Sequence, residues 1–352
     1  MRRLQTRYWQ VDPTNIDMKI IRQAAQLIRE GQTVAFPTET VYGLGADGLN
    51  PEGVRRIFQA KGRPMDNPLI LHVADPQDIH KLVATIPAQA EILIKTFWPG
   101  PLTLIMPAAP GIPNEVTAGL KTVGIRMPAH HVALALIKEA GVPLAAPSAN
   151  RSGYPSPTAA SHVLADLEGK IGAVLDGGVT GLGLESTVLD LTEKTPTILR
   201  PGGITQEQLT AVLGEVLQDP GLENKELKPK SPGMKYTHYA PRADVFVLLG
   251  EPQSVAAKAQ AILQENRQNK IPTALLLSSE TWPFVDKKDA VYAREMGSHK
   301  APEEIAHKLY HELRMCDQAG SKVILVEGYS SEGIGTAIMN RLLKSAGYRV
   351  IN

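Results

Sequence analysis

Strands and helices alternate regularly in the last third of the chain, and this pattern leaves few folds open. Strands alternating with helices at such spacing build a parallel sheet with helices on both faces. Residues 244–352 are therefore expected to form a small doubly wound, Rossmann-like domain. The predicted elements are strands at 245–249, 273–277 and 323–326, and helices at 254–264, 302–317 and 336–346.

This part of the chain lacks the familiar nucleotide-binding motifs. No Gly-x-Gly-x-x-Gly follows its first strand, and the whole chain contains neither a P-loop nor a His-Glu-x-x-His zinc pair. Gly333-Ile334-Gly335, before the last predicted helix, is a weak indication of an anion site. Metal-ligand spacing is also lacking, so any divalent ion should arrive with the phosphates of a nucleotide.

Length and composition indicate an ordinary globular protein with two domains. The chain has 352 residues, more than one hydrophobic core comfortably supports. Lys and Arg total 37 against 36 for Asp and Glu, so affinity for nucleic acid must come from a local patch. Cys316 is the one cysteine, which excludes an internal disulfide and fits a reducing compartment. No run of about 18 apolar residues occurs, so we expect a cytoplasmic protein without a membrane span.

A basic stretch from Lys61 to His72 follows a predicted helix. Gly62-Arg63-Pro64 must end that helix, because proline lacks an amide donor and restricts the residue before it. Lys61 and Arg63 therefore stand at a helix-to-loop junction, ahead of a short buried strand that carries His72. Such a loop suits a phosphate, but surface charges and a structural histidine explain the same residues about equally well.

Three further segments place polar groups next to predicted buried strands. The turn from Pro37 to Gly45 carries two threonines, a glutamate and a tyrosine, the loop from Pro147 to Thr158 is rich in hydroxyls, and Arg126 stands between apolar residues. Backbone amides of such loops can bind phosphate oxygens. Each segment has a plain alternative: a turn that satisfies its own backbone, a linker with Thr158 capping the next helix, and an arginine paired with a protein carboxylate.

Residues 215–242 lose the periodicity of strands and helices and are rich in lysine and proline, as is typical of a connector. The end of this stretch, residues 231–241, carries three rings and a lysine that a plain spacer does not need. We therefore expect a first α/β domain at 15–205, a capping helix and a linker or lid at 206–243, and the second domain at 244–352.

Four of these features together resemble the two-domain Sua5 form of the threonylcarbamoyl-AMP synthase family. They are Lys61-x-Arg63, Ser148-x-Asn150, the Pro37 to Gly45 turn and the 231–241 segment. The resemblance implies a YrdC-like α/β domain with a twisted mixed sheet and a ligand cavity, followed by a parallel-sheet Sua5 domain. It also implies a nucleotidyltransferase that joins L-threonine, bicarbonate or carbon dioxide, and ATP into L-threonylcarbamoyl-AMP and pyrophosphate.

The same resemblance implies roles for individual residues. Lys61 and Arg63 would be the catalytic cations that hold the triphosphate with Mg²⁺, and Arg126 would pair with the threonine carboxylate. The residues that bind ATP would be Arg63, Asn67, Thr122, Ser148, Asn150, Ser156, Arg200 and Tyr236. Those that bind threonine would be Thr40, His72, Arg126, Ala146 through its backbone, and Ser186.

The resemblance implies three substrates: ATP, L-threonine, and bicarbonate or carbon dioxide. It also implies a downstream threonylcarbamoyl transferase complex and contact with tRNA, in which the threonylcarbamoyl group becomes part of N6-threonylcarbamoyladenosine. No membrane is implied. Because carboxylated threonine decomposes readily in water, the aromatic connector is expected to act as a lid, with Tyr236 closing over the nucleotide. Positioning and charge stabilisation dominate phosphoryl chemistry, which agrees with a site that lacks an obvious nucleophile.

Two other functions stay open on the sequence. The hydroxyl-rich, partly basic surface could bind RNA without catalysis, although the near-neutral charge and the lack of an aromatic stacking run favour the enzyme. A carbamoyltransferase-type maturation factor also contains a YrdC-like domain, but it resembles a longer chain with zinc-finger and acylphosphatase parts. Threonine-dependent release of pyrophosphate from ATP distinguishes the three.

Overall fold

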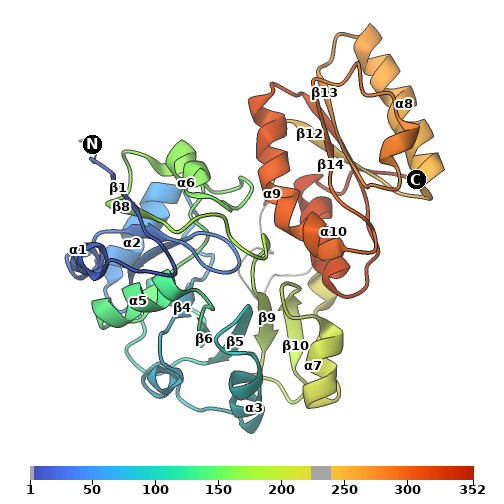
Figure 1. The fold of residues 1–352 in the computed structure, drawn as a ribbon. Helices are drawn as coiled ribbons and strands as arrows, with labels where there is room; N and C mark the ends of the chain where they lie inside the picture. The colour runs from blue at the N-terminus through green and yellow to red at the C-terminus, as the bar shows by residue number, and fades with distance from the viewer. Residues whose placement is uncertain (1–3, 223–238) are drawn as a thin grey trace. The chain divides into compact units, whose positions relative to one another are not determined.

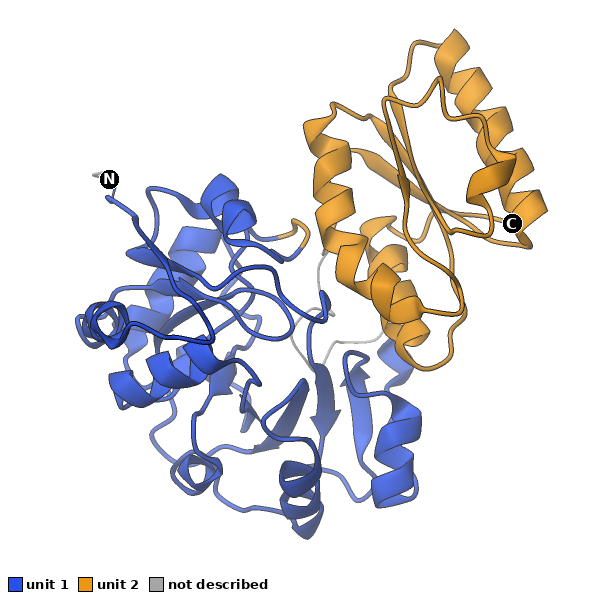
Figure 2. Cartoon of the chain, in the orientation of Figure 1, with its two compact units in different colours: residues 1–152, 156–235 blue, residues 153–155, 236–352 orange. Residues whose placement is uncertain are grey.

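The computed structural model describes residues 4–222 and 239–352, which belong to two compact units (Figures 1 and 2). The second unit comprises residues 153–155 and 236–352, and the first comprises the rest of the chain up to residue 235. Both units are α/β, as the sequence predicts. Most of the expected lid lies outside the described residues, and so does Tyr236.

The first unit is built on a mixed sheet. Its described strands follow the order β1-β8-β2-β3-β7-β4-β6-β5-β9-β10-β11. Strands β4 and β6 run parallel, whereas β7 is antiparallel to β4 and β5 is antiparallel to β6. The bounds are β1 Arg7–Gln10, β2 Val34–Phe36, β3 Gly43–Asp47, β4 Ile70–His72, β5 Leu102–Pro107, β6 Thr122–Arg126, β7 Leu144–Ala145, β8 Ala173–Asp176, β9 Thr187–Asp190, β10 Thr197–Arg200 and β11 Leu217–Gln218.

Helices cover both faces of this sheet. Helices α1 and α5 pack side by side on one face, against Phe36 and Leu144 (Figure 1). Helix α2 packs on the other face, against Leu44 and Leu71. The helices are α1 Met18–Arg29, α2 Pro51–Lys61, η1 Pro76–Lys81, α3 Ala88–Phe97, α4 Asn114–Thr117, α5 His131–Ala140, α6 Ala160–Leu167, α7 Gln206–Leu213 and η2 Pro220–Leu222.

Helix α2 ends where the sequence predicts. Asn50 caps its first turn through the side chain, Pro51 occupies its first position, and Gly62 ends it with a φ of 63°. This left-handed geometry suits glycine, which has no Cβ to clash. Lys61 is therefore the last helical residue, and Arg63 begins the loop.

Two local features of the first unit differ from the sequence expectation. The predicted Thr158 cap is wrong: α6 is preceded by Ala159, and the Thr158 amide instead donates to Nδ1 of His162 at 3.2 Å. Strand β3 was not predicted from the sequence. Its residues, Gly43-Leu44-Gly45-Ala46-Asp47, lack the β-branched and aromatic side chains that favour strands. Its strand neighbours, β2 and β7, supply the hydrogen bonds that define it.

The second unit is an all-parallel sheet with helices, which confirms the doubly wound prediction. Its described strands follow the order β14-β13-β15-β12-β16. Figure 1 shows α8 on one side of this sheet and the paired helices α9 and α10 on the other. The bounds are β12 Asp244–Leu248, α8 Pro252–Gln268, β13 Thr273–Leu277, η3 Trp282–Phe284, β14 Tyr292–Glu295, α9 Pro302–Gln318, β15 Val323–Glu327, α10 Ile334–Ser345 and β16 Val350–Ile351.

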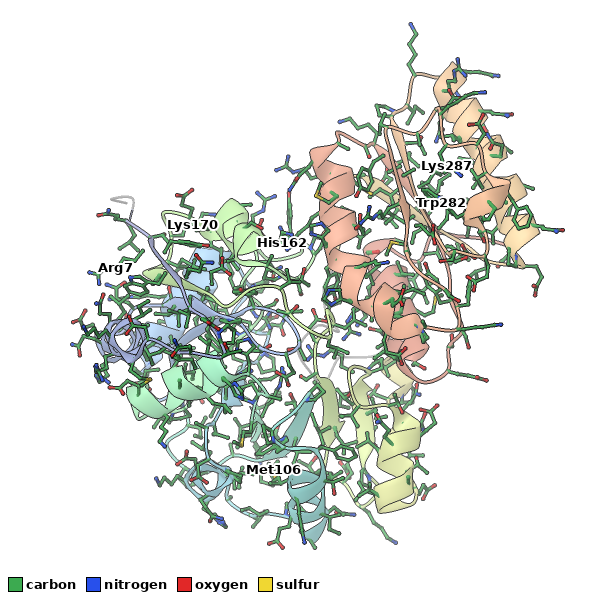
Figure 3. The ribbon with its side chains drawn as sticks, in the orientation of Figure 1. Arg7, Met106, His162, Lys170, Trp282 and Lys287 are labelled. Carbon is green, nitrogen blue, oxygen red and sulfur yellow. The ribbon has the colours of Figure 1, made fainter. Side chains whose placement is uncertain are left out.

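Two side chains illustrate how the second unit packs. Cys316 is fully buried in α9, and burial raises the pKa of its thiol, so it serves packing. The ammonium of Lys287 lies 4.5 Å from the ring centroid of Trp282, a cation–π contact beside η3 (Figure 3). In the part of the chain that the structure describes, no helix combines the length and apolarity needed to cross a bilayer.

Candidate active site

Neighbouring strands of the first unit carry a row of buried polar side chains. His72 and Arg126 are register partners on β4 and β6, so they project from the same face of the sheet. Thr103 continues the row on β5, one residue beyond the pair formed by Leu104 and Ile125. All three polar residues are buried. His72 is the register partner of Leu144, which packs against α1 and α5. The row therefore lies on the same face of the sheet as these two helices.

His72 is neutral at physiological pH. Burial, and then the nearby guanidinium of Arg126, lower the pKa of His72 to about 3. Its Nδ1 lies 3.2 Å from the carbonyl oxygen of Ile70, and its ring meets Phe36 edge-on with 6.2 Å between centroids. A neutral imidazole can share a hydrogen bond with a polar ligand without adding charge to the site.

Arg126 is held by the turn that precedes β3. Its Nη2 donates to Oγ1 of Thr40 at 3.0 Å, and its Nε donates to the carbonyl oxygen of Gly100 at 3.2 Å. Nη2 also approaches Oε1 of Glu39 to 2.7 Å. That contact is an ion pair by distance, but its angle is not that of a hydrogen bond. Of the two anions that the sequence left open for Arg126, the structure shows a protein carboxylate.

Further hydroxyls and a second arginine extend the row toward β9 and β10. Oγ1 of Thr103 lies 2.8 Å from Oγ of Ser186. Arg200 donates to the carbonyl oxygen of Ser186 from Nε at 3.1 Å and from Nη2 at 3.0 Å. Oγ of Ser156 donates to Oε1 of Glu185, the neighbour of Ser186, at 2.5 Å. Ser156, Ser186 and Arg200, from three separate segments, therefore lie together.

The ammonium of Lys61 fixes the loop that follows β7. Its Nζ donates to the carbonyl oxygens of Ser148 and Asn150, the latter at 2.6 Å, and lies 3.4 Å from Oδ1 of Asn150. Oγ of Ser148 in turn donates to Oδ1 of Asn150 at 2.6 Å. Lys61 is only 2% exposed, and a buried ammonium needs such oxygens around it. The two motifs, Lys61-x-Arg63 and Ser148-x-Asn150, are thus joined physically.

Arg63 lies against the residues that lead into β4. Its Nη2 donates to the carbonyl oxygen of Pro68 at 3.2 Å, and its Nε to that of Asn67 at 3.4 Å. Nδ2 of Asn67 is buried and has no acceptor among the described residues. A small hollow begins at the next residue; it is lined by Pro68, Leu69, Ile70, Ile105, Leu120, Thr122, Val123 and Gly124. An unpaired buried amide beside a hollow is a position where a ligand acceptor can bind.

Residues 39–43 join the Arg126 group to the Lys61 loop. Thr40 accepts the hydrogen bond from Arg126, and two residues later the carbonyl oxygen of Tyr42 accepts one from the amide of Ala149 at 2.8 Å. Gly43 then forms a bridge with Ser148. The residues expected to bind threonine and the loop expected to bind ATP are therefore neighbours within the first unit.

Ala146 lies at the start of the same loop, where its amide donates to the carbonyl oxygen of Ile70 at 3.0 Å. Among the residues assigned to the site from the sequence, Tyr236 alone lies outside the described ranges 4–222 and 239–352. The other assigned residues come from segments that lie far apart in the chain. These segments lie on or beside neighbouring strands of the sheet, in the order β3, β7, β4, β6, β5, β9 and β10.

Three residues of this site were not assigned to it from the sequence. Glu39 stands between two threonines in the hydroxyl-rich turn, and Glu185 precedes Ser186, so both had a local signal. Thr103 had none, because a single threonine inside the apolar strand β5 reads as an ordinary strand residue.

Two family models match the chain, one for each part. The model described as "Telomere recombination" (Sua5, YciO and YrdC proteins) matches residues 26–202. The model described as "Threonylcarbamoyl-AMP synthase, C-terminal domain" matches residues 204–347.

Relatives of the same length are similar along the whole chain. The threonylcarbamoyl-AMP synthase of Bacillus subtilis is 48% identical over 352 residues, which cover 99% of this chain and 100% of that one. The threonylcarbamoyl-AMP synthase of Pyrococcus abyssi is 48% identical and covers 94% of this chain and 95% of its own. The crystal structure of P. abyssi Sua5 complexed with L-threonine gives a TM-score of 0.93 at 47% identity, over 98% of this chain and 99% of that one.

Proposed function

Because this chain belongs to the threonylcarbamoyl-AMP synthase family, in its two-domain Sua5 form, we propose that it makes L-threonylcarbamoyl-AMP. The reaction joins L-threonine, bicarbonate or carbon dioxide, and ATP, and it releases pyrophosphate. The observation that carries the proposal is the junction at residues 39–43. There, a buried arginine beside hydroxyls adjoins a loop that a buried lysine holds in place.

The Arg126 end of the site is suited to a small hydroxylated amino acid. The guanidinium of Arg126 would pair with the threonine carboxylate, and Thr40 and Ser186 offer hydroxyl partners on either side of it. Neutral His72 adds a hydrogen-bonding group without a second positive charge. The crystallised P. abyssi relative is complexed with L-threonine, which supports the same ligand for this chain.

The Lys61 end of the site is suited to ATP. Lys61 holds the loop of Ser148 and Asn150 in place, and this loop would lie against the phosphates. Arg63 and Arg200 would offset the charge of the phosphates. The side-chain amide of Asn67, which has no acceptor within residues 4–222 and 239–352, precedes the residues that line the small hollow at Thr122. Ser156 and Tyr236 complete the assigned set.

The chemistry needs positioning more than a protein nucleophile. A carboxylated threonine nitrogen presents a carbamate oxygen, which attacks the α-phosphorus of ATP, and pyrophosphate leaves. Cations and hydrogen-bond donors stabilise the charge that gathers on the phosphate oxygens in the transition state. Holding both reactants side by side lowers the barrier by making the attack effectively unimolecular.

A magnesium ion would enter this site with ATP. Among residues 4–222 and 239–352, no three His, Cys, Asp or Glu side chains lie close enough to hold a metal ion. The ion would be bound mainly by phosphate oxygens and water. When bound, it would neutralise part of the triphosphate charge.

The proposal extends to the fate of the product. L-threonylcarbamoyl-AMP would pass to a threonylcarbamoyl transferase complex that forms N6-threonylcarbamoyladenosine at position 37 of tRNA, and the chain itself would contact tRNA. The segment expected from the sequence to act as a lid, with Tyr236, lies largely outside the described residues.

The test is release of pyrophosphate from ATP with and without L-threonine and bicarbonate, with mass spectrometry of the adenylate product. Release that requires both, together with the expected product mass, supports the proposal. Serine should be used as a competing substrate, because one methyl group is worth only about 1 to 3 kcal/mol of discrimination.

Two control arms distinguish the other functions. Binding of RNA without threonine-dependent pyrophosphate release would indicate a binding module. Dependence on carbamoyl phosphate in place of threonine and bicarbonate would indicate a carbamoyltransferase.

A further inference from the structure

Glu39 has a buried carboxylate that the fold leaves without a hydrogen bond. Its side chain is 18% exposed, yet both carboxylate oxygens are buried and have no donor among the described residues. Its backbone is well fixed, since the carbonyl oxygen accepts a hydrogen bond from the amide of Leu182 at 2.7 Å. Burying an ionised carboxylate without donors is costly, so the arrangement leaves a place for a donor that residues 4–222 and 239–352 do not supply.

The neighbouring guanidinium does not fill that place. Nη2 of Arg126 is 2.7 Å from Oε1 of Glu39, but the angle is wrong for a hydrogen bond, and the N–H groups of Arg126 are directed to Thr40 and Gly100. A cation and an anion thus stand side by side in the site. This pair matches the two charges of an amino acid zwitterion, with the carboxylate on Arg126 and the ammonium on Glu39.

We propose that Glu39 binds the α-ammonium of L-threonine and removes the proton that must leave before the nitrogen can be carboxylated. The inference rests on the proposed function. It assigns a proton acceptor to the carboxylation step. Lys61 and Arg126 are cations, His72 is buried next to one, and Glu185, the other carboxylate described at this site, already accepts a hydrogen bond from Ser156.

The proton balance is simple. The ammonium gives one proton to the Glu39 carboxylate, which leaves a neutral amine whose lone pair forms the bond to carbon. With bicarbonate, the hydroxyl group leaves and takes the second nitrogen proton as water. With carbon dioxide, no group leaves, and the second proton passes to solvent. In both cases the nitrogen ends as a carbamate, and Glu39 returns its proton to solvent afterwards.

Among the described residues, the charged and titratable groups recorded against Glu39 are Arg126 from β6 and His130 ahead of α5, and His72 on β4 is the register partner of Arg126. Burial lowers the pKa of His130, although Glu39 acts in the opposite direction, and the pKa of His72 is about 3. Neither histidine competes as a cation for Glu39 near neutral pH, so the ammonium of the substrate meets an available anion.

The first experiment uses the unmodified chain. Binding of L-threonine is compared by calorimetry with binding of its α-hydroxy analogue, 2,3-dihydroxybutanoate, which lacks the ammonium. We expect the hydroxy acid to bind about a hundredfold more weakly, because it cannot pair with the buried carboxylate. Equal affinities would overturn the inference without any variant.

The second experiment uses Glu39→Gln, which keeps the size and the acceptor oxygen but not the charge. The preference for threonine over the hydroxy acid should shrink to within about tenfold. At pH 7, kcat/KM for threonine should fall by about a hundredfold or more, as expected for loss of a general base. It should then rise by about tenfold per pH unit above pH 7, as free amine becomes available from solution.

A merely structural role would leave the ligand preference and the shape of the pH profile unchanged. Glu39→Asp, which keeps the carboxylate, should restore part of the preference for threonine and part of the normal pH profile. Glu193→Gln, at an exposed glutamate, should behave as the unmodified chain. If Glu39→Gln does not fold, the pH profile of kcat/KM for Glu39→Asp and the ligand comparison in the first experiment still test the role of Glu39. A chain without threonine-dependent pyrophosphate release would contradict the proposed function, whereas an active chain with an unaffected Glu39→Gln variant would contradict only this inference.

Discussion

The ammonium of Lys61 and the carbonyl oxygen of Asn150 form a 2.6 Å hydrogen bond between residues 89 positions apart in the chain. A second bond from the same nitrogen reaches the carbonyl oxygen of Ser148. One buried cation therefore fixes the end of α2 and the loop after β7 relative to each other. Lys61 thus contributes to holding the Ser148-x-Asn150 loop in place.

Replacing Lys61 by methionine should damage that loop. The variant keeps an apolar stem of similar length but leaves the two carbonyl oxygens without their donor, at a cost of about 1 to 3 kcal/mol. Urea unfolding measures this loss, and KM for ATP should rise by about tenfold. Lys170→Met, at an exposed lysine on the same unit, is the control. A wild-type KM for ATP in Lys61→Met would show that the loop does not depend on the ammonium.

His72 should make the first domain less stable in mild acid. Its folded pKa of about 3 lies below the ordinary value of 6.5, so between these values the unfolded chain binds a proton that the folded chain does not. This contribution is fully present above pH 6.5 and is lost as the pH falls, by up to about 1.4 kcal/mol per pH unit.

A His72→Gln variant lacks that titration. Its free energy of unfolding, measured in urea at pH 7, 6 and 5, should therefore fall less than that of the unmodified chain. His131→Gln, at an exposed histidine, should keep the normal pH dependence. Parallel curves for the unmodified chain and His72→Gln would contradict a neutral, buried His72.

Thr103 should position Ser186 and, through it, Arg200. Thr103→Val keeps the shape of the side chain but removes the hydroxyl that lies 2.8 Å from Oγ of Ser186. The loss of one buried hydrogen bond should cost about 1 kcal/mol of stability and lower kcat/KM by up to about tenfold. Steady-state kinetics with threonine and ATP varied in turn measures this. Exposed Thr96→Val is the control, and equal kinetics for both variants would rule out the positioning role.

The second domain contains its own pH-dependent pair. Buried Glu327 accepts hydrogen bonds from the amide of Ser278 at 2.7 Å and from Oγ1 of Thr281 at 2.8 Å, and it lies 2.9 Å from Nε2 of His299. The hydrogen bond to Glu327 raises the pKa of His299. The resulting stability is fully present below pH 6.5, the ordinary histidine value, and is lost as the pH rises through the higher folded pKa.

In Glu327→Gln, the pKa of His299 should return toward its ordinary value, which NMR titration of the ring measures directly. The variant should also be less stable by about 2 to 3 kcal/mol. Glutamine has one acceptor oxygen where glutamate has two, so it cannot accept hydrogen bonds from Ser278, Thr281 and His299 together. Exposed Glu332→Gln should change neither quantity. An unchanged His299 pKa in Glu327→Gln would contradict the pairing.

Local patterns were enough for much of the fold. The second domain follows from the alternation of strands and helices, and β13 spans the predicted residues 273–277. The capping box of Thr205 and Gln208 is present at the start of α7. Strand β14 was missed, because its four residues are half exposed and lack an apolar run.

The sequence by itself determined which segments carry polar groups, because strand ends, glycine stops and basic motifs are encoded by residues a few positions apart. Only the tertiary structure decided their partners: Lys61 with the Asn150 loop, Glu39 with Arg126, and Thr103 with Ser186. Those contacts depend on the order and register of strands distant in the chain, and a local pattern carries no information about either. The neutral state of His72 has the same origin, since it follows from burial beside Arg126 on the neighbouring strand.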